Sequence, residues 1–391
     1  MPALLLPHPD GTVRPWAPTA PDTTAAGPAP AATAARSGVR TAYAAVHVVA
    51  DPLADADPAD VVSVDWDATL AFREHIWSCG LGVAEAMDTA QRGMGLDWTT
   101  TRELIRRTGE LARPTAAPWC AGVGTDHLPP GPASLDQVVS GWLHQLDVVV
   151  EAGAVPVVMA SRALAAAAAS PQDYRDAYGA LLSRSPVPVL LHWLGEPFDP
   201  ALAGYWGHRD LGTAAAELAA LCAEHADKVV GVKVSVLDAD VEIAFRRALP
   251  GGVSCYTGDD FNYPALIEGD EQGHSEALLG IFGAIAPVAG AALGALAAGD
   301  PAGYRRLMDP TVALSREVFR APTRLYKVGV VFLAYLAGHQ EHFRMVGGLE
   351  SARSVVHLSE LLRLADTAGA LPDPDLAVAR MRPILAAAGI R

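Results

Sequence analysis

The stretch VVGVKVSVLD, from Val229 to Asp238, decides how the rest of the chain is interpreted. Its apolar, β-branched residues predict a buried strand, yet an ammonium group, Lys233, stands in the middle. An unpaired buried ammonium is costly, so such a lysine either pairs with a carboxylate or gives up its proton. The partner would be Asp238, Asp259 or Asp260; the neutral amine would be a nucleophile that forms a Schiff base with a carbonyl group. This strand alone leaves both interpretations open.

Segments of similar character recur along the chain and alternate with amphipathic helical segments. The other predicted strands are Ala44–Val49, Gly82–Met87, Trp119–Val123, Val155–Met159, Val187–Leu191, Val253–Tyr256 and Ser275–Leu279. The predicted helices between them are Asp67–Ser78, Thr100–Leu111, Leu135–Glu151, Pro171–Leu182, Thr213–His225 and Val241–Ala248. Eight strands separated by helices predict a (β/α)8 TIM barrel, an α/β fold, with a doubly wound sheet as the alternative.

The two ends of the chain differ from this pattern. Residues 1–40 are predicted to form an N-terminal arm, because Thr12–Ser37 is rich in Ala, Pro and Thr and has no apolar periodicity. The barrel is predicted to occupy residues 41–300. Residues 301–391 are predicted to be a C-terminal helical extension, with helices at Ala302–Arg320, Thr323–Leu336, Ser351–Ala368 and Leu376–Ala388.

Charge and composition exclude some classes of partner. The net charge of −15 over 391 residues argues against nucleic acid, which requires a basic face. The four cysteines form no CxxC pair, which favours a reducing cytoplasm, and the N-terminal residues do not have the pattern of a signal peptide. The uncharged segment Ala277–Gly299 is long enough to span a membrane, but its Ala and Gly content and Pro287 favour a buried strand followed by a closely packed helix.

Five short motifs, taken in order, resemble those of a known enzyme family. They are Ala121–Gly124, Pro188–Leu191, Gly231–Lys233, Tyr256–Asp260 and Gly283–Pro287. Their order and spacing resemble the dihydrodipicolinate synthase and N-acetylneuraminate lyase family of class I aldolases, over roughly residues 40 to 370. The resemblance implies a barrel followed by helices, a dimer or tetramer of identical chains, and a Schiff base between Lys233 and a 2-oxo acid.

The turn after the second predicted strand departs from that family. The family's G-T-T-G-E turn binds the oxo-acid carboxylate, and the matching stretch here is MDTAQ. Thr89 keeps one hydroxyl, Ala90 lacks the other, Gln91 replaces the acid, and Asp88 adds a carboxylate that would repel pyruvate. Asp88, Thr89 and Gln91 are therefore predicted to bind a substrate other than a simple oxo acid.

Two further positions are compared with the family in the same way. The family's proton-relaying tyrosine is matched by His192, whose imidazole is a competent general acid and base, although it could equally be a packed histidine bonded to backbone. In the family's substrate-facing loop, Thr257, Asp259 and Asp260 would bind hydroxyl groups or hold the charge of the lysine; the alternative is a turn built on Gly258.

Together these features predict a cytoplasmic Schiff-base lyase or aldolase acting on a small carbonyl compound, with Lys233 and His192 as catalytic residues. No organic cofactor, required metal, nucleic acid or membrane is expected as a partner. The substrate is expected to be an oxo acid or a sugar-derived carbonyl compound, and not the substrate of the lysine-biosynthesis synthase. Two alternatives remain: a metal-dependent barrel enzyme acting on a carbohydrate and using ligands among His47, His127, His192, His274 and Glu276, and a barrel without catalytic activity.

Overall fold

The computed structural model describes residues 4–19, 39–55, 57, 60–129 and 131–390. Eight parallel strands close into a barrel, in which β10 pairs with both β3 and β9 and so joins the two ends of the sheet. The strands are β3 (Ala42–Ala45), β4 (Gly82–Glu85), β5 (Trp119–Val123), β6 (Val155–Val158), β7 (Val189–Leu194), β8 (Val229–Ser235), β9 (Ser254–Thr257) and β10 (Glu276–Leu279). The predicted (β/α)8 barrel is confirmed.

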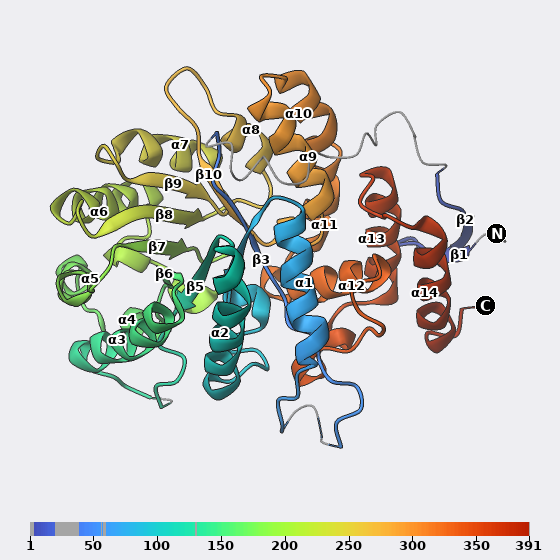
Figure 1. The fold of residues 1–391 in the computed structure, drawn as a ribbon, viewed down its shortest axis with the longest axis horizontal. Coiled ribbons are helices and arrows are strands. Elements are labelled where there is room, and N and C mark those ends of the chain that lie inside the picture. Colours follow the sequence, from blue (N-terminus) through green and yellow to red (C-terminus); the bar gives the residue numbers. More distant parts are fainter. Residues whose placement is uncertain (1–3, 20–38, 56, 58–59, 130, 391) are drawn as a thin grey trace.

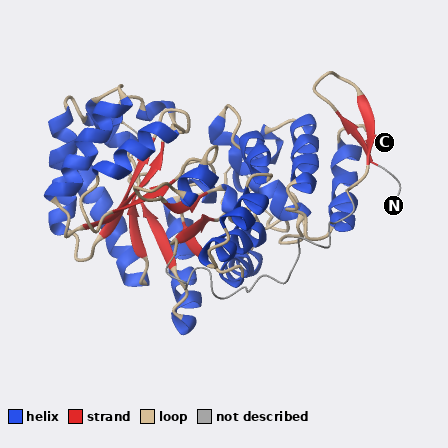
Figure 2. Cartoon of the chain, turned by 90° about the horizontal axis from the view of Figure 1, so that it is seen from above, coloured by secondary structure: helices blue, strands red, loops and turns tan. Residues whose placement is uncertain are grey.

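Helices surround the barrel. When the molecule is seen from above, the barrel strands lie among these helices (Figure 2). They are α1 (Trp66–Ser78), α2 (Trp98–Ala112), α3 (Leu135–Ala152), α4 (Arg162–Ala167), α5 (Pro171–Arg184), α6 (Leu211–Glu224), α7 (Ala239–Ala248), α8 (Tyr263–Glu268) and α9 (Ala286–Ala297). Local sequence sets their ends. In α3, for example, Ser134 and Gln137 form a reciprocal capping box, and Gly153 ends the helix at a φ of 85°.

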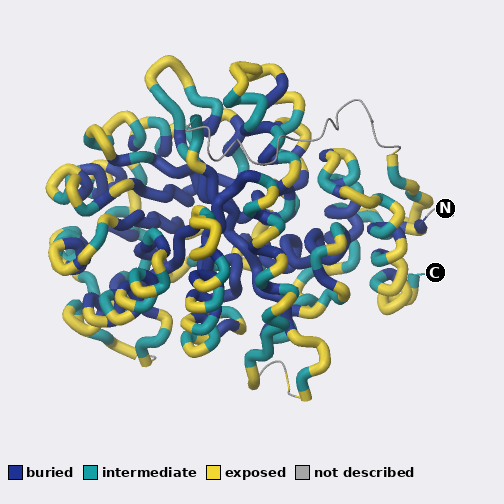
Figure 3. Tube along the Cα trace, viewed as in Figure 1, coloured by how far each residue is buried: buried dark blue, intermediate teal, exposed yellow. Residues whose placement is uncertain are grey.

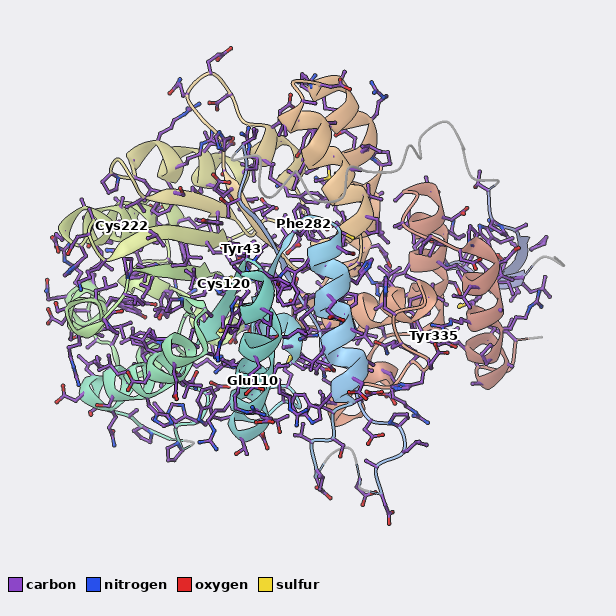
Figure 4. The ribbon with its side chains drawn as sticks, viewed as in Figure 1. Tyr43, Glu110, Cys120, Cys222, Phe282 and Tyr335 are labelled. Atoms are coloured by element: carbon purple, nitrogen blue, oxygen red, sulfur yellow. The ribbon has the colours of Figure 1, made fainter. Side chains whose placement is uncertain are left out.

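Apolar side chains form two concentric layers. Inside the barrel, residues from several strands fill the axis, among them Tyr43 and Cys120 (Figure 4). A larger cluster fills the space between strands and helices and continues into the C-terminal helices. Most residues of the barrel strands are accordingly buried (Figure 3). Val230 on β8 is an exception and is 38% exposed. The polar groups described below lie where the strands end.

The first strand begins and ends earlier than its sequence suggests. The prediction was Ala44–Val49, whereas β3 spans Ala42–Ala45. Residues 46–49 are also buried, but they form a loop after the strand and contact other parts of the chain. For example, His47 is hydrogen-bonded to Gln340. An apolar run predicts burial, and burial alone does not place the end of a strand.

The uncharged segment Ala277–Gly299 is a strand followed by a helix, as predicted. Most of β10 is buried, and α9 packs so closely that a Cβ on Gly290 would lie 2.1 Å from the carbonyl oxygen of Cys79. Among the described residues, we find no helix with the length and apolar character needed to cross a membrane.

The C-terminal region consists of helices α10 (Pro301–Met308), α11 (Thr311–Val318), α12 (Tyr326–Leu336), α13 (Val355–Thr367) and α14 (Pro374–Ala387). The single helix predicted at Ala302–Arg320 is two helices, because Pro310 interrupts it. In Figure 1 these helices extend from one side of the barrel. Residues 20–38 of the predicted arm lie outside the described residues. The start of the arm does have regular structure, since β1 (Leu4–Pro7) and β2 (Val13–Trp16) form an antiparallel hairpin near α13 and α14.

Candidate active site

A small pocket lies at the carboxyl ends of the strands, where barrel enzymes place their chemistry. Five segments of the barrel and two C-terminal helical segments contribute to it. Its lining residues are Met87, Asp88, Thr89, Leu194, Phe198, Lys233, Ser235, Asp260, Gly280, Phe319 and Tyr326. Four residues predicted from the sequence, Lys233, Asp88, Thr89 and Asp260, are therefore brought together.

Lys233 lies on β8 and is 8% exposed. Burial lowers the pKa of its amine, and the negative charges of Asp260 and Asp88 oppose this shift. Among the described residues, the amine is attracted by these two carboxylates without a close ion pair to either. The arrangement favours an amine that loses its proton more easily than an ordinary lysine and that faces a pocket.

The stem of Lys233 fits because residue 258 has no side chain. A Cβ added to Gly258 would lie 2.1 Å from Oγ of Ser235 and 2.8 Å from Cε of Lys233. Contacts this short are not tolerated by a packed interior. The glycine of the Tyr256–Asp260 motif therefore gives the lysine its place, in addition to any role in the turn.

Asp260 is the carboxylate with the largest electrostatic effect on Lys233. It follows β9, is 3% exposed, and accepts a hydrogen bond of 3.0 Å from the backbone N–H of Ile281. Burial raises the pKa of Asp260 to about 7, although the Ile281 N–H and the charge of Lys233 act in the opposite direction. An acid and an amine with pKa values displaced toward each other can exchange a proton near neutral pH.

Asp88 and Thr89 belong to a turn with unusual backbone angles. The residues that flank it, Ala86 and Gln91, have φ values of 52° and 66°, in the left-handed region that non-glycine residues seldom occupy. Such conformations cost free energy and persist where the surrounding structure holds them. The turn presents the Asp88 carboxylate to the pocket, and Thr89 Oγ1 lies 2.8 Å from the hydroxyl of Tyr326.

His192 lies beside Lys233 in the barrel but does not line the pocket. The two residues are in register on β7 and β8, and Nε2 of His192 lies 3.2 Å from Oγ of Ser235, which does line it. Burial lowers the pKa of His192 well below its ordinary value, and the neighbouring Lys233 adds to this effect. The imidazole is therefore neutral near pH 7, and its route to the pocket passes through the Ser235 hydroxyl.

Three predicted binding residues have partners elsewhere and are not among those that line the pocket. Gln91 donates to the carbonyl of Val346 at 2.9 Å and so holds a loop. Thr257 donates to Glu242 at 3.0 Å, and Asp259 accepts bonds from residues of the following turn, including the N–H of Phe261 at 2.8 Å. Gln91 and Asp259 therefore hold backbone groups around the pocket, and Thr257 also accepts a hydrogen bond of 3.2 Å from the N–H of Asp259.

A wider cavity of about 460 Å³ opens outside the inner pocket. Asp88 and Leu194 line both, so they mark the passage between them. Its charged residues are mostly paired: Arg92 with Asp126, and Arg162 with Asp199. Asp88 has no such ion pair among the described residues, although its charge acts on both Lys233 and Lys327.

The histidines and acids considered as metal ligands do not converge. Among the described residues, no group of three or more His, Cys, Asp or Glu side chains is placed to hold a metal ion. His47 is bonded to Gln340, and His274 lies 3.6 Å from Glu276. The hypothesis of a metal-dependent enzyme therefore gains no support from the positions of these residues.

Sequence reasoning did not identify Ser235, Phe198, Phe319 or Tyr326. Ser235 had a detectable signal, since it is two residues after Lys233 and side chains two apart on a strand share a face. Phe319 and Tyr326 had none, because they belong to the C-terminal helical region, about 90 residues beyond Lys233 in the chain.

The chain folds as a TIM barrel followed by C-terminal helices, and this fold is similar to that of solved dihydrodipicolinate synthases. Similar solved structures include a dihydrodipicolinate synthase from Bacillus anthracis (15% identity, TM-score 0.61, covering 86% of this chain and 99% of that one). Others are a putative dihydrodipicolinate synthetase from Pseudomonas aeruginosa (16%, 0.62, 84% and 99%) and the 4-hydroxy-tetrahydrodipicolinate synthase of Methylacidiphilum fumariolicum SolV (16%, 0.62, 88% and 99%). The resemblance stated from the five motifs is thus confirmed for the fold.

The chain itself belongs to the family described as "Protein of unknown function (DUF993)", whose model matches residues 4–390. No curated protein matches the sequence.

Proposed function

We propose that this protein is a Schiff-base-forming lyase or aldolase that acts on a small carbonyl compound. The observation that carries the proposal is the environment of Lys233: a buried amine with a lowered pKa at the carboxyl end of a barrel strand, lining a pocket with two carboxylates. A neutral amine attacks a carbonyl carbon, and the protonated imine then serves as an electron sink for making or breaking the adjacent carbon–carbon bond.

The pocket residues have separate roles in this proposal. Lys233 is the nucleophile, and Asp260 accepts and returns the proton of its ammonium form. His192 and Ser235 move a proton during the carbon–carbon bond step, the serine facing the pocket and the imidazole supporting it from behind. Thr89 and Asp88 bind the oxygen atoms of the substrate. Gln91, Thr257 and Asp259 contribute by fixing the loops that carry these groups.

The proposed substrate is a hydroxylated, uncharged carbonyl compound of the kind derived from sugars. The carboxylate of Asp88 stands at the passage into the inner pocket, where it would repel a substrate carboxylate and accept hydrogen bonds from hydroxyl groups. The apolar and aromatic walls formed by Leu194, Phe198 and Phe319 leave a volume of about 10 Å³ in the inner pocket, enough for about one water molecule. The body of the substrate would therefore lie in the adjoining cavity of about 460 Å³, and its carbonyl end would reach toward Lys233. An oxo acid would bind less well, because its carboxylate and that of Asp88 repel each other.

A second buried lysine, Lys327, could also form a Schiff base, so a test of the proposal must identify which lysine reacts. The chain has three lysines, Lys228, Lys233 and Lys327. Lys327 is 4% exposed, and burial lowers its pKa as well, but it does not line the inner pocket. An adduct on Lys233 alone is the result that the proposal requires.

The experiment is reduction with sodium borohydride in the presence of pyruvate, hydroxypyruvate, dihydroxyacetone and a set of ketoses, followed by peptide mass spectrometry. We expect a covalent adduct on Lys233 with at least one neutral hydroxylated ketone. Lys327→Ala is the matched control and should form the adduct as the wild type does. An adduct on Lys327 in place of Lys233, or no adduct with any compound, would reject the proposal.

We extend the proposal to the setting of the enzyme: a cytoplasmic homodimer or homotetramer. The four cysteines, all of them free, are consistent with a reducing compartment. Analytical ultracentrifugation of the full-length chain would measure the oligomeric state, and a monomer at micromolar concentration would contradict this part.

A further inference from the structure

We infer that Tyr326 is the proton-transferring residue for imine formation at Lys233, and that helix α12 of the C-terminal region thereby supplies a catalytic group to the barrel. This inference rests on the proposed Schiff-base function. Tyr326 is the first residue of α12 and lines the same pocket as Lys233, although nothing in its local sequence distinguishes it from a core tyrosine.

Three contacts fix the side chain of Tyr326. Its ring is stacked on Phe319, with centroids 4.4 Å apart and planes 15° apart. The ring of Phe198 is nearly perpendicular to it, with centroids 6.4 Å apart. Its hydroxyl lies 2.8 Å from Oγ1 of Thr89. The side chain is 5% exposed, so the oxygen is held on the wall of the pocket and not free to turn into solvent.

The hydroxyl has the protonation state that this role needs. Burial raises the pKa of Tyr326 well above its ordinary value, and the charges of Asp88 and Asp260 add to this effect, while Thr89 opposes it. The phenol is therefore protonated at neutral pH and is a donor. The same two carboxylates act on Lys233, which places the phenol, the amine and both acids within one electrostatic cluster.

In this inference Tyr326 transfers a proton at two stages of imine formation. The lone pair of the neutral Lys233 amine forms the N–C bond while the carbonyl π pair moves to oxygen, which takes the proton of Tyr326. The phenolate recovers a proton from the lysine nitrogen, giving the carbinolamine. Tyr326 then protonates the carbinolamine hydroxyl, water leaves as the nitrogen lone pair forms C=N, and the phenolate takes one proton from solvent. One amine, one carbonyl and one proton yield one protonated imine and one water.

The other polar groups of the pocket suit this step less well. The hydroxyl of Ser235 is hydrogen-bonded to His192, whose neutral form is favoured. A serine hydroxyl is also a weaker acid than a phenol. Asp260 already compensates the charge of Lys233, and a backbone N–H holds it. Among the described residues, Thr89 is the one hydrogen-bond partner of the Tyr326 hydroxyl, which leaves that hydroxyl able to donate to a substrate oxygen.

The test compares Tyr326→Phe with the wild type in full-length protein, using dihydroxyacetone and pyruvate as probes. Each protein is incubated with a probe for increasing times and then pulsed with borohydride, so that both the rate and the final fraction of imine on Lys233 are measured. A general acid changes the rate and not the equilibrium. We expect Tyr326→Phe to form imine about 100-fold more slowly and to reach the wild-type fraction.

Tyr335→Phe is the matched control, because Tyr335 lies on the same helix and donates to the carbonyl of Arg380, away from the pocket. It should behave as the wild type. Thr89→Val, which removes the hydroxyl partner of Tyr326, should slow imine formation by a smaller factor. Thermal melts of all the variants show whether each remains folded.

The outcomes separate the two proposals. If the wild type forms no imine with any probe, the Schiff-base function is rejected and this inference with it. If the wild type and Tyr326→Phe form imine at equal rates, only the role of Tyr326 is rejected. A variant that loses rate and final fraction together while remaining folded would make Tyr326 a wall of the binding site, which also contradicts the inference.

Discussion

Nε2 of His192 lies 3.2 Å from the hydroxyl oxygen of Ser235, and His192 is in register with Lys233 on the neighbouring strand. Because burial lowers the pKa of His192 well below its ordinary value, the imidazole is neutral near pH 7. Replacing it with Phe should lower turnover by about 100-fold or more and spare imine formation. Borohydride trapping and steady-state turnover, measured side by side on His192→Phe, check this. Equal loss of both would make His192 a packing residue.

Lys233→Ala should abolish adduct formation and turnover while the protein remains folded, since the amine makes no close ion pair with the described residues. Mass spectrometry of the trapped protein and a thermal melt measure the two effects. Lys228→Ala, just before the amino-terminal end of the same strand, is the control and should retain activity. Near-normal turnover in Lys233→Ala would show that the Schiff base is not part of the reaction.

Asp260→Asn should move the pH dependence of imine formation to lower pH. The carboxylate stabilises the ammonium form of Lys233, so its removal lowers the pKa of the amine further, and the neutral nucleophile becomes available at a lower pH. The rate of trapping, followed from pH 5 to 10, measures the shift. Asp88→Asn should shift the curve in the same direction by less, because Asp260 has the larger effect on Lys233. A shift toward higher pH would contradict the proposed pairing.

The substitution of Asp88 by Gly together with Ala90 by Thr tests the substrate class. The wild type should trap neutral hydroxylated ketones faster than pyruvate, because a carboxylate at the passage repels an anion. The double variant removes that charge and adds a hydroxyl, so its preference should shift toward pyruvate, by about tenfold if the lost repulsion is worth about 1.4 kcal/mol. If the wild type prefers pyruvate and the variant gains nothing, Asp88 does not act on the substrate.

Glu242 provides a test of stability, separate from the chemistry. Burial raises its pKa to about 8, against the hydrogen bonds from Ser275 and Thr257, so the folded protein holds a proton that the unfolded chain releases above pH 4.5. Stability should therefore fall as pH rises from about 4.5 to 8 and then level off. Glu242→Gln keeps the shape without the charge and should flatten this part of the pH profile of the melting temperature. An unchanged slope would place the effect on another group.

The fold was largely predictable because its signal is local and repeated. Each strand of the barrel is a short apolar run between helices, and seven of the eight predicted strands lie within a few residues of the observed ones. Strand β3 was displaced because its apolar run continues into a buried loop. In the C-terminal region, one helix was predicted where the structure has α10 and α11, although Pro310 between them indicates an interruption.

The site was predictable only where one strand end carries the chemistry. Lys233, Asp88, Thr89 and Asp260 each follow or occupy a strand, and the order of the strands brings them together. Whether a side chain near a strand end faces the pocket depends on the conformation of its loop: Gln91 turns away to Val346. Tyr326 reaches the pocket through tertiary packing, which the spacing of residues along one chain does not encode.

The wall that Phe319 and Tyr326 add to the pocket makes the reactivity of Lys233 depend on the docking of a distant part of the chain. If α12 separated from the barrel, water would reach the lysine, the penalty for its charge would disappear, and its amine would return to an ordinary, protonated state. Local opening of this kind costs less free energy than global unfolding. Under the proposed function, activity would therefore be lost at a denaturant concentration that still leaves the barrel folded, and a nascent chain would have no reactive lysine until its last quarter, residues 301–391, had docked.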